Sequence, residues 1–453
     1  MDEVGYGRTG SLNSRTKPSF LPRTMMFKFT KKKKMTRSWW EILWLTAWAE
    51  LATVARTLRK RLVGKVCAVK VLGARGMMQS RFVGRAPTRV ATRSPAARGG
   101  RRSRPRSAPE AQELVTSRSR ELGESGVKVA PIGIGAWSWG DALYWSSDGW
   151  SDEKEGLARG ALQAYLELCP EDPWIDTAEV YGGIGGESER IIGRFLRDSV
   201  STDAGGKPTS TSRPKVATKF AALPWRYSKG SVVDACRSSL ARCKTESCDL
   251  YQLHWPGLWF NDQYVEGLEE VVKQGLAKSV GVSNYSDKRL QEAHSKLKAR
   301  GVPLASNQVH YNLLYRLPET NGVLEKCQEL GVTLVAYSPL AQGVLSGKYD
   351  EKNLPTGPRA RIYNESFMRK ARPLIELMRE IGENHGGKSN AQVALNWLLC
   401  NPLVTVIPGA KNRQQVEDLM GAIGWELEEG EVIELRKAAL AVPPVQGFPA
   451  EDL

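Results

Sequence analysis

From about residue 120 onward, short and continuously apolar runs alternate with longer segments in which apolar residues recur every three or four positions. The longer segments are typical of helices that bury one face, and the short runs of strands buried on both faces of a parallel sheet. We expect strands over 132–136, 174–178, 215–220, 248–254, 277–283, 304–311, 333–340 and 404–410. We expect helices over 152–168, 188–199, 230–243, 263–274, 286–299, 319–330, 372–385 and 389–400, with two more beginning near 412 and 428.

Eight strand–helix units in about 310 residues fit an α/β fold of the (β/α)8 TIM barrel type, because right-handed crossovers wind every unit in one direction. The text ahead of the first barrel strand, RELGESGVKVAP, predicts a short N-terminal β-hairpin that turns at Ser125-Gly126. A doubly wound sheet is the competing fold, and it would carry a GxGxxG phosphate loop after its first strand. Residues 133–138 lack the third glycine and residues 183–188 also fail the pattern, so the barrel is favoured.

The first 108 residues differ from the rest of the chain in charge. They hold 26 Lys and Arg against four acidic residues, a net +22, so the whole-chain value of +16 leaves −6 for residues 109–453. Residues 77–108 are rich in Arg, Ser and Ala and contain no acid, which is the composition of an organelle transit peptide. We therefore expect 1–108 to be a mostly disordered basic targeting leader and 109–453 to be the barrel. Composition does not separate plastid from mitochondrion.

The leader's charge says little about what the barrel binds, so we expect no nucleic-acid partner. Its most apolar run, residues 39–55, holds two Glu and is shorter than the roughly 20 residues of a spanning helix, so no stable membrane span is expected. The seven cysteines include no CxxC pair, and there are only four histidines. Reduced thiols and no metal site are the expectation.

Four polar residues lie at, or just beyond, the ends of three successive predicted strands: Asp176, Tyr181, Lys219 and His254. The carboxyl ends of barrel strands gather the active groups of such folds on one rim. A buried ammonium would lower the pKa of a neighbouring phenol, which is ordinarily near 10, and the ammonium itself needs a counter-ion. The set predicts that Tyr181 protonates a carbonyl oxygen, tuned by Lys219 and Asp176, while His254 orients the carbonyl.

Reduction of a carbonyl also needs a hydride donor, which no side chain provides. Ser283, Asn284 and Gln308, on or just after the fifth and sixth predicted strands, can bond a carboxamide, and Tyr337 can stack on a flat ring. After the eighth strand, residues 409–413 open a helix with two cations, Lys411 and Arg413, a setting that suits a phosphate.

At this point the chain resembles the aldo-keto reductases over about residues 120–440. The resemblance rests on IDTAEVYGGIGGESERIIG, VATKF, DLYQLHWPG, GLAKSVGVSNYS, VAYSPLAQGVLSGKY and VIPGAKNRQQVED. The segments KFAALPWR and LPTGPRARIY further resemble plastid members of plants and algae, including a subgroup with pyridoxal reductases. The resemblance implies a TIM barrel, NADPH, and a catalytic tetrad of Asp176, Tyr181 as the acid, Lys219 and His254.

The resemblance also carries cofactor contacts onto this sequence. It implies nicotinamide contacts at Ser283, Asn284, Gln308 and Tyr337, a pyrophosphate loop of Ser338, Pro339, Leu340, Gln342, Gly343 and Ser346, and an adenosine phosphate end at Lys411, Asn412 and Gln415. Residues 341–371 are expected to fold over the cofactor. Leu419 stands where many members have Asn for the adenine, which implies one hydrogen bond fewer. Trp137, Trp225 and Trp255 are expected to wall an apolar, aromatic substrate pocket.

The sequence thus predicts an NADPH-dependent reductase of an aldehyde or ketone, with pyridoxal reductase as a narrower version. The alternative is a nucleotide-sensing regulatory barrel with little turnover. We expect a small-molecule carbonyl as partner, a monomer or weak oligomer, and a plastid location, with mitochondrion or cytoplasm as alternatives.

Overall fold

The computed structural model describes residues 115–445, with gaps at 143, 146–147, 170, 184, 199–212 and 258–260. All of the described residues belong to one compact unit. The predicted leader and its boundary with the barrel lie outside the described residues. Across the part that is described, no helix is long and apolar enough to cross a membrane, and no three potential metal-ligating side chains gather. The six cysteines found there are free thiols.

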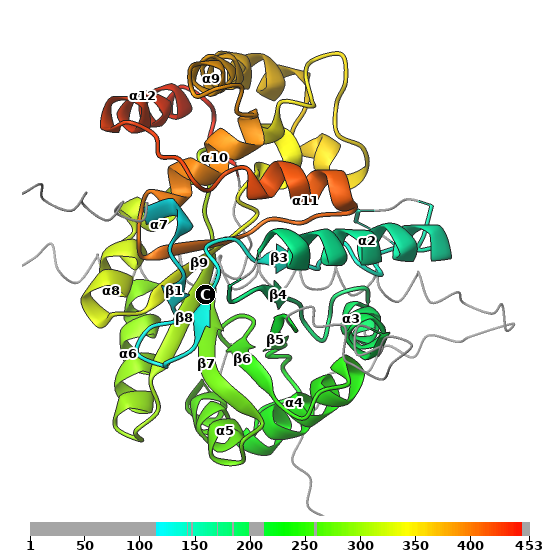
Figure 1. The fold of residues 1–453 in the computed structure, drawn as a ribbon. Coiled ribbons are helices and arrows are strands. Elements are labelled where there is room, and N and C mark those ends of the chain that lie inside the picture. The colour runs from blue at the N-terminus through cyan, green and yellow to red at the C-terminus, as the bar shows by residue number, and fades with distance from the viewer. Residues whose placement is uncertain are drawn as a thin grey trace, which may run out of the picture. The chain divides into compact units, whose positions relative to one another are not determined.

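Eight parallel strands follow one another in chain order, as the sequence predicts (Figure 1). They are β3 (Ile134–Gly135), β4 (Trp174–Asp176), β5 (Lys215–Phe220), β6 (Cys248–Leu253), β7 (Ala277–Ser283), β8 (Leu304–His310), β9 (Thr333–Tyr337) and β10 (Val404–Ile407). The first and last strands meet through bridges from Ile132 to Val406 and from Gly135 to Gly409, which close the sheet into a barrel. Every residue of β4 and β8 is buried, as in strands covered on both faces.

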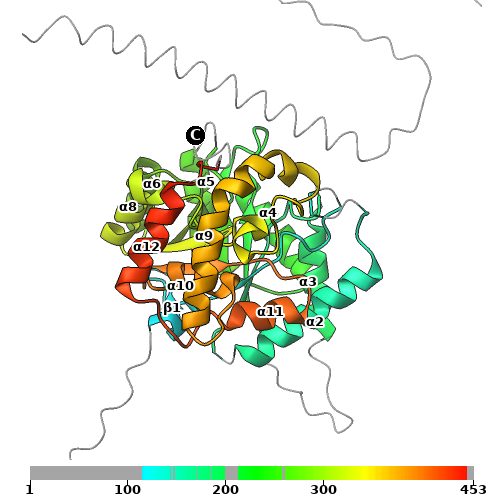
Figure 2. The same cartoon turned by 90° about the horizontal axis from the view of Figure 1, so that it is seen from above.

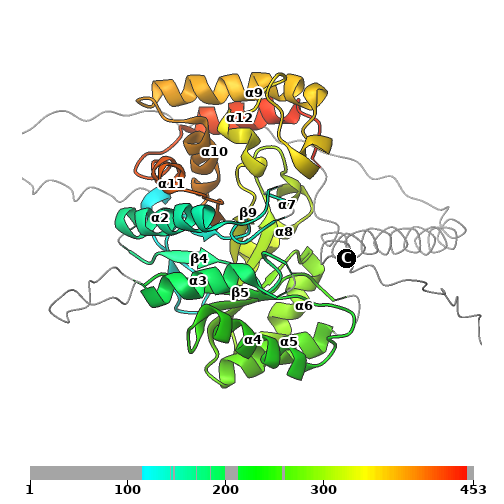
Figure 3. The same cartoon turned by 90° about the vertical axis from the view of Figure 1, so that its right-hand side faces the viewer.

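Helices cover the outside of the barrel (Figures 1 and 2). They are α2 (Asp152–Leu168), α3 (Glu187–Asp198), α4 (Lys229–Cys243), α5 (Asn261–Lys273), α6 (Asp287–Lys298), α7 (Leu317–Thr320), α8 (Val323–Leu330), α9 (Glu365–Asn384), α10 (Asn390–Leu399), α11 (Arg413–Met420) and α12 (Glu429–Leu440). Helix α11 packs against α2, and α9 against α10 and α12 (Figure 3). Serine caps start several of them: Ser151, Ser228 and Ser389 each accept a hydrogen bond from a backbone N–H of the first turn.

Two predicted helices differ from the observed ones. The single helix expected over 319–330 is split into α7 and α8 by Gly322, whose φ of 83° ends one helix and begins the next. The helix expected to start near residue 372 begins instead at Glu365, where Asn364 caps the first turn, and it runs through Pro373. A proline inside a helix removes one backbone hydrogen bond, and burial of Phe367, Leu374 and other residues on the inner face of α9 outweighs that loss.

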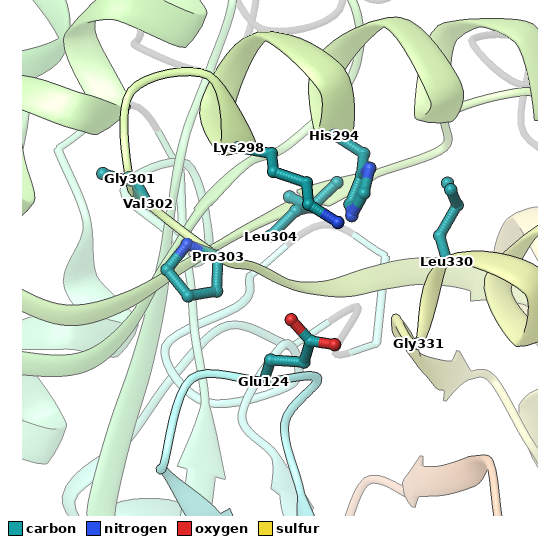
Figure 4. A pocket seen from close by; sticks show the side chains of 9 residues that line it. All are labelled: Glu124, His294, Lys298, Gly301, Val302, Pro303, Leu304, Leu330 and Gly331. Atoms are coloured by element: carbon teal, nitrogen blue, oxygen red, sulfur yellow. The ribbon is translucent and has the colours of Figure 1, made fainter.

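The predicted N-terminal hairpin is present and covers the amino ends of the strands. Its two strands, β1 (Arg120–Glu121) and β2 (Lys128–Val129), are antiparallel, and Gly126 in the turn has a φ of 73°. The Thr333 hydroxyl, at the start of β9, donates to Glu121 O (2.9 Å) and accepts from Gly123 N (3.0 Å). A pocket of about 210 Å³ opens here between the hairpin, α6 and the turn after α8 (Figure 4). It lies at the end of the barrel opposite the predicted active groups.

Candidate active site

The structure brings the four predicted catalytic side chains together at the carboxyl ends of the strands. The Lys219 ammonium is fully buried and donates to three oxygens: Asp176 Oδ2 at 2.5 Å, Thr177 O at 2.9 Å and Tyr181 Oη at 3.1 Å. The Tyr181 ring also lies under this cation, with Nζ 4.6 Å from the ring centroid. Every hydrogen of the ammonium therefore has an acceptor, and the phenol oxygen is one of them.

Two glutamines hold the Asp176 carboxylate in place. Oδ1 accepts hydrogen bonds from Gln308 Nε2 (2.8 Å) and Gln252 Nε2 (3.2 Å), while Oδ2 serves Lys219. An ion pair taken out of water is tolerated when further hydrogen bonds satisfy its remaining atoms. The sequence pointed to Gln308 as a carboxamide ligand, whereas here its amide group holds the buried ion pair. Gln252 was missed, although a glutamine in the apolar run CDLYQLH is a visible signal.

His254 follows β6 and is the fourth member of the group, in contact with Tyr181. Its ring meets that of Tyr181 edge to face, with centroids 5.5 Å apart and planes at 77°, and packs against Trp255 at 4.7 Å. Burial, and then the charge of Lys219, hold its pKa well below 6.5. The imidazole is therefore neutral near pH 7 and carries a single N–H. Within the described residues its Nδ1 is buried without a hydrogen-bond partner.

The pKa of Tyr181 differs from the prediction. Burial raises it above 10, and although the Lys219 ammonium acts to lower it, Asp176 adds to the rise. The predicted effect of the lysine is present, but burial of the phenol outweighs it. Burial alone would lower the pKa of Lys219, and Asp176 and Tyr181 together raise it above 10.5. At neutral pH the site therefore holds a neutral phenol hydrogen-bonded to a charged ammonium.

The predicted nicotinamide residues lie on the same rim and are joined to it by hydrogen bonds. Asn284, after β7, has a left-handed φ of 61°. Its Nδ2 donates to the backbone carbonyl oxygen of His254, just after β6 (3.0 Å). Tyr337 Oη donates to Asn284 Oδ1 (3.1 Å), and Ser283 Oγ donates to Gln308 O (2.8 Å). The Tyr337 ring stacks on His310 with centroids 5.4 Å apart and an interplanar angle of 11°. The ends of four strands, β6 to β9, are thus tied together beside the tetrad.

The predicted pyrophosphate loop has an unusual backbone. Ser338, Gln342 and Gly343 all adopt positive φ values, of 49°, 56° and 96°, and strain of this kind is often held at ligand-binding loops. The loop contains a 3-10 turn, Ala341–Ser346, in which Ser346 Oγ donates to Gly343 O (2.8 Å). The Gln342 side chain accepts a hydrogen bond from Tyr144 Oη (2.9 Å), which links this loop to the one after β3. Pro339 and Leu340 lie on the same loop.

At the predicted adenosine phosphate end, Asn412 and Gln415 close the first turn of α11. Asn412 Oδ1 accepts from Gln415 N (2.9 Å), and Gln415 Oε1 accepts from Lys411 N (2.8 Å). Arg413 points elsewhere, because its guanidinium pairs with Glu167 of α2 at 2.8 Å and lies 3.5 Å from Glu417. Leu419 is buried on the inner side of α11. The proposed second cation for the phosphate, Arg413, is thus already engaged in this structure.

Two of the three predicted pocket tryptophans have ring contacts with the tetrad, and the third is exposed. Trp137 stacks on Tyr144 (centroids 5.1 Å) and faces Tyr181 (6.1 Å), and Trp255 is buried against His254. Trp225, after β5, is 61% exposed. Tyr144 was missed, and the aromatic-rich stretch WSWGDALYW is the signal that could have found it.

Comparison with known proteins places this arrangement in a family. The chain belongs to the aldo/keto reductase family, whose sequence model matches residues 131–439. Members of this family are NADPH-dependent oxidoreductases, so the chain is an enzyme that acts on small carbonyl compounds with this cofactor. The predicted family, fold, cofactor and enzyme class are confirmed.

A chloroplastic pyridoxal reductase of Arabidopsis thaliana is 38% identical over 331 residues, which cover 70% of this chain and 85% of that protein. A thermostable aldo-keto reductase crystallised with the inhibitor epalrestat is 29% identical, with a TM-score of 0.55 and coverage of 71% of this chain and 99% of the other. An aldo-keto reductase of Klebsiella pneumoniae in complex with NADPH is 25% identical, with a TM-score of 0.54 and coverage of 73% and 97%.

Proposed function

We propose that the chain reduces the carbonyl group of a ring-bearing aldehyde, with Tyr181 as the general acid. The observation that carries this proposal is the contact of the Tyr181 hydroxyl with the buried Lys219 ammonium at 3.1 Å, inside a site walled by aromatic rings. NADPH supplies a hydride to the carbonyl carbon. The rim fits such a cofactor, because buried polar atoms such as His254 Nδ1 and Arg359 Nε have no partner among the described residues.

The residues then have distinct tasks. Tyr181 Oη gives its proton to the carbonyl oxygen, and the raised pKa of Tyr181 keeps that proton in place at neutral pH. The Lys219 ammonium, already hydrogen-bonded to the phenol oxygen, stabilises the phenolate that remains. Asp176 keeps Lys219 charged and fixed. A neutral His254 donates one hydrogen bond to the carbonyl oxygen and orients it for protonation.

Tyr181→Phe tests the role of the phenol. The proton donor is lost while the ring remains, so turnover should fall on the order of 10²- to 10⁴-fold. NADPH affinity, followed by quenching of tryptophan fluorescence, should stay within about twofold, since the hydroxyl is proposed to touch the substrate. Undiminished turnover would refute the assignment. If wild type and variant were equally inert toward a broad aldehyde panel while NADPH bound tightly, the nucleotide-sensing alternative would be favoured.

The substrate we propose is pyridoxal or a closely similar aromatic aldehyde. Two observations support this: the 38% identity to a protein named pyridoxal reductase, and the stacked rings of Trp137 and Tyr144 beside Tyr181. In steady-state assays that follow NADPH absorbance, pyridoxal should give a higher kcat/KM than short aliphatic aldehydes. A higher kcat/KM for the aliphatic aldehydes would show that the pocket does not select aromatic substrates.

Trp137→Ala and Trp225→Ala form a matched pair for the pocket wall. Loss of the inner ring should raise the KM for pyridoxal about tenfold, because burial of one aromatic face contributes roughly 1.5 kcal/mol. Loss of the exposed ring should change KM less than about twofold. A comparable rise in KM for Trp225→Ala would show that this ring also reaches the substrate, as the sequence predicts.

We also propose a plastid location, supported by the chloroplastic relative and by the composition of residues 77–108. N-terminal sequencing of the protein from isolated plastids should find a start close to residue 109. Recovery of the intact leader, or of the protein only in mitochondria or cytoplasm, would contradict it. A monomeric or weakly oligomeric state stays a prediction, which light scattering of the barrel would test.

A further inference from the structure

Glu179 lies in the turn that carries Tyr181 to the rim of the barrel. Tyr181 N donates to Ala178 O (3.0 Å), so residues 178–181 form a tight turn with Glu179 at its second position. The next two residues are glycines with positive φ values of 74° and 100°, and they have no side chain that could hold the loop. Contacts between the turn and neighbouring segments are therefore what can fix the position of the phenol.

The Glu179 side chain binds the segment that follows Lys219 at the end of β5. Its Oε1 accepts a hydrogen bond from Ala221 N (2.6 Å), and its backbone N donates to Lys219 O (3.4 Å). Both terminal nitrogens of Arg226 donate to the same carboxylate, with Nη1 2.6 Å from Oε1 and Nη2 3.2 Å from Oε2. A two-point contact of this kind fixes orientation as well as distance. Glu179 thus joins the loop of the proposed proton donor to the strand that carries the buried cation.

Arg226, in the loop between β5 and α4, is held by contacts of its own. Its Nη1 donates to Ala221 O (3.3 Å), its guanidinium lies 4.2 Å from the centre of the Phe220 ring, and its backbone N donates to Leu223 O (2.9 Å). The side chains of Arg226 and Glu179 are 20% and 11% exposed. Their attraction is therefore screened less than that of an ion pair in open solvent.

The same segment after β5 also holds the fourth member of the tetrad. His254 N donates to Phe220 O (2.9 Å), and Trp255 Nε1 donates to Ala222 O (3.3 Å). Residues 219–222 therefore bind the loops after both neighbouring strands, β4 and β6, which pair with β5 on either side (Figure 1). Within this arrangement, the Glu179–Arg226 ion pair lies between the segment of Tyr181 and the segment of Lys219.

We propose that Glu179 and Arg226 are positioning residues for the proton transfer, which set the contact between the Tyr181 hydroxyl and the Lys219 ammonium. This inference rests on the proposed role of Tyr181 as the acid. The contact is 3.1 Å long, and a misplacement of about 1 Å in a reacting group can lower a rate about 100-fold. A looser turn should slow proton transfer, because the ammonium would stabilise the phenolate less well, and should leave binding of the aldehyde and of NADPH unchanged.

Glu179→Gln tests the proposal with little change of shape. The amide oxygen can still accept from Ala221 N, but the charged two-point contact with Arg226 is lost. We expect kcat to fall about tenfold, with the KM for pyridoxal and the NADPH affinity within about twofold. The solvent deuterium isotope effect on kcat should rise, because proton transfer becomes slow relative to the other steps. Turnover is expressed per NADPH-binding site, counted by fluorescence titration, so that an unfolded fraction does not lower kcat.

Two variants of Arg226 and a control complete the test. Arg226→Gln should reproduce both effects, and Arg226→Lys, which keeps one charged contact, should recover part of kcat. The variant that carries both Glu179→Gln and Arg226→Gln should lose little more than either single variant, because the two side chains act through one contact. Arg194→Gln is the matched control: this guanidinium binds Glu155 through two contacts of 2.8 and 2.7 Å between α3 and α2. It should leave kcat within about twofold and the isotope effect unchanged.

Three results would overturn the proposal: an unchanged kcat in Glu179→Gln, a lower kcat with an unchanged isotope effect, or a rise in the KM for pyridoxal in place of the fall in kcat. The last of these would place the pair in the substrate pocket. Tyr181→Phe separates this inference from the proposed function. If Tyr181→Phe keeps full turnover, Tyr181 is not the acid and both ideas fail. If Tyr181→Phe loses turnover and Glu179→Gln does not, only the positioning role fails.

Discussion

Strand β5 carries two lysine–aspartate pairs, four residues apart, and they have opposite uses. At its amino end Lys215 binds Asp172 at 2.5 Å, and at its carboxyl end Lys219 binds Asp176 at the same distance. The first pair is about one quarter exposed on both partners, whereas the second is fully out of water. Residue types, spacing and contact distance are equal, so burial is the property that distinguishes the two pairs.

Burial changes what an ion pair can do. The pair at Lys215 is still reached by water, which screens it, and it contributes about 1 kcal/mol or less to folding. Out of water, the pair at Lys219 requires two glutamines to complete it and acts on the phenol of Tyr181 with little screening. The inner pair is therefore suited to tune the proton donor that we propose, whereas the outer pair ties β5 to the turn before β4.

Removal of each lysine should show the largest difference between the two pairs, in both turnover and stability. Lys219→Met leaves Asp176 buried and unpaired and removes the cation that stabilises phenolate, so kcat should fall about 10³-fold and the free energy of unfolding by roughly 3–5 kcal/mol. Lys215→Met should leave kcat within about twofold and cost at most about 1 kcal/mol. Steady-state kinetics and urea unfolding measure both. Similar losses in the two variants would show that burial is not the cause.

Asp176→Asn sharpens the same contrast while it preserves side-chain shape. The Asp176 charge raises the pKa of Lys219 and of Tyr181, so without it both groups should lose their protons at lower pH. The alkaline limb of the pH–kcat profile should move to lower pH, and kcat should fall roughly 10- to 100-fold. Asp172→Asn should leave the profile in place. A profile unchanged in Asp176→Asn would mean that neither group controls the alkaline limb.

Burial should also decide how the histidines respond to acid. Burial lowers the pKa of His310 to about 4, so the unfolded chain, with a histidine pKa near 6.5, binds the proton more readily. The contribution of neutral His310 to the free energy of unfolding is fully present above pH 6.5. It is lost as the pH falls toward 4, and amounts to about 3 kcal/mol in all. His310→Gln should flatten the acid side of the stability curve over this range, measured by urea unfolding.

The smallest effect is expected at the amino end of the barrel. The pocket beside the hairpin is lined by residues that include Glu124, His294 and Lys298 (Figure 4). It lies at the amino ends of the strands, the end at which Lys215 begins β5. Lys298→Ala should therefore change kcat, KM for pyridoxal and NADPH affinity by less than about twofold each. A larger change in turnover would show that this end of the barrel is coupled to the chemistry.

Much of the fold could be predicted because the signals are local. Continuous apolar runs and intervening amphipathic segments predicted eight strands in the right order, and Ser125-Gly126 predicted the hairpin turn. One error fell where tertiary packing overrides a local rule, at Pro373 inside α9, and another where a local signal was not read, at Gly322 between α7 and α8. Residues of the tetrad were found because strand ends converge in any barrel, which makes position along the chain informative.

The sequence by itself determined the order of the strands, the rim on which the polar residues gather, and the family to which the chain belongs. Only the tertiary structure decided which charges are paired: Lys219 with Asp176, Arg413 with Glu167, and Arg359 with no carboxylate among the described residues. It also showed that burial raises the pKa of Tyr181 by more than the neighbouring lysine lowers it. The physical reason is that helices and strands follow from residues close together in the sequence. The energy of a charge depends instead on distant segments, which exclude water from it or supply its partner.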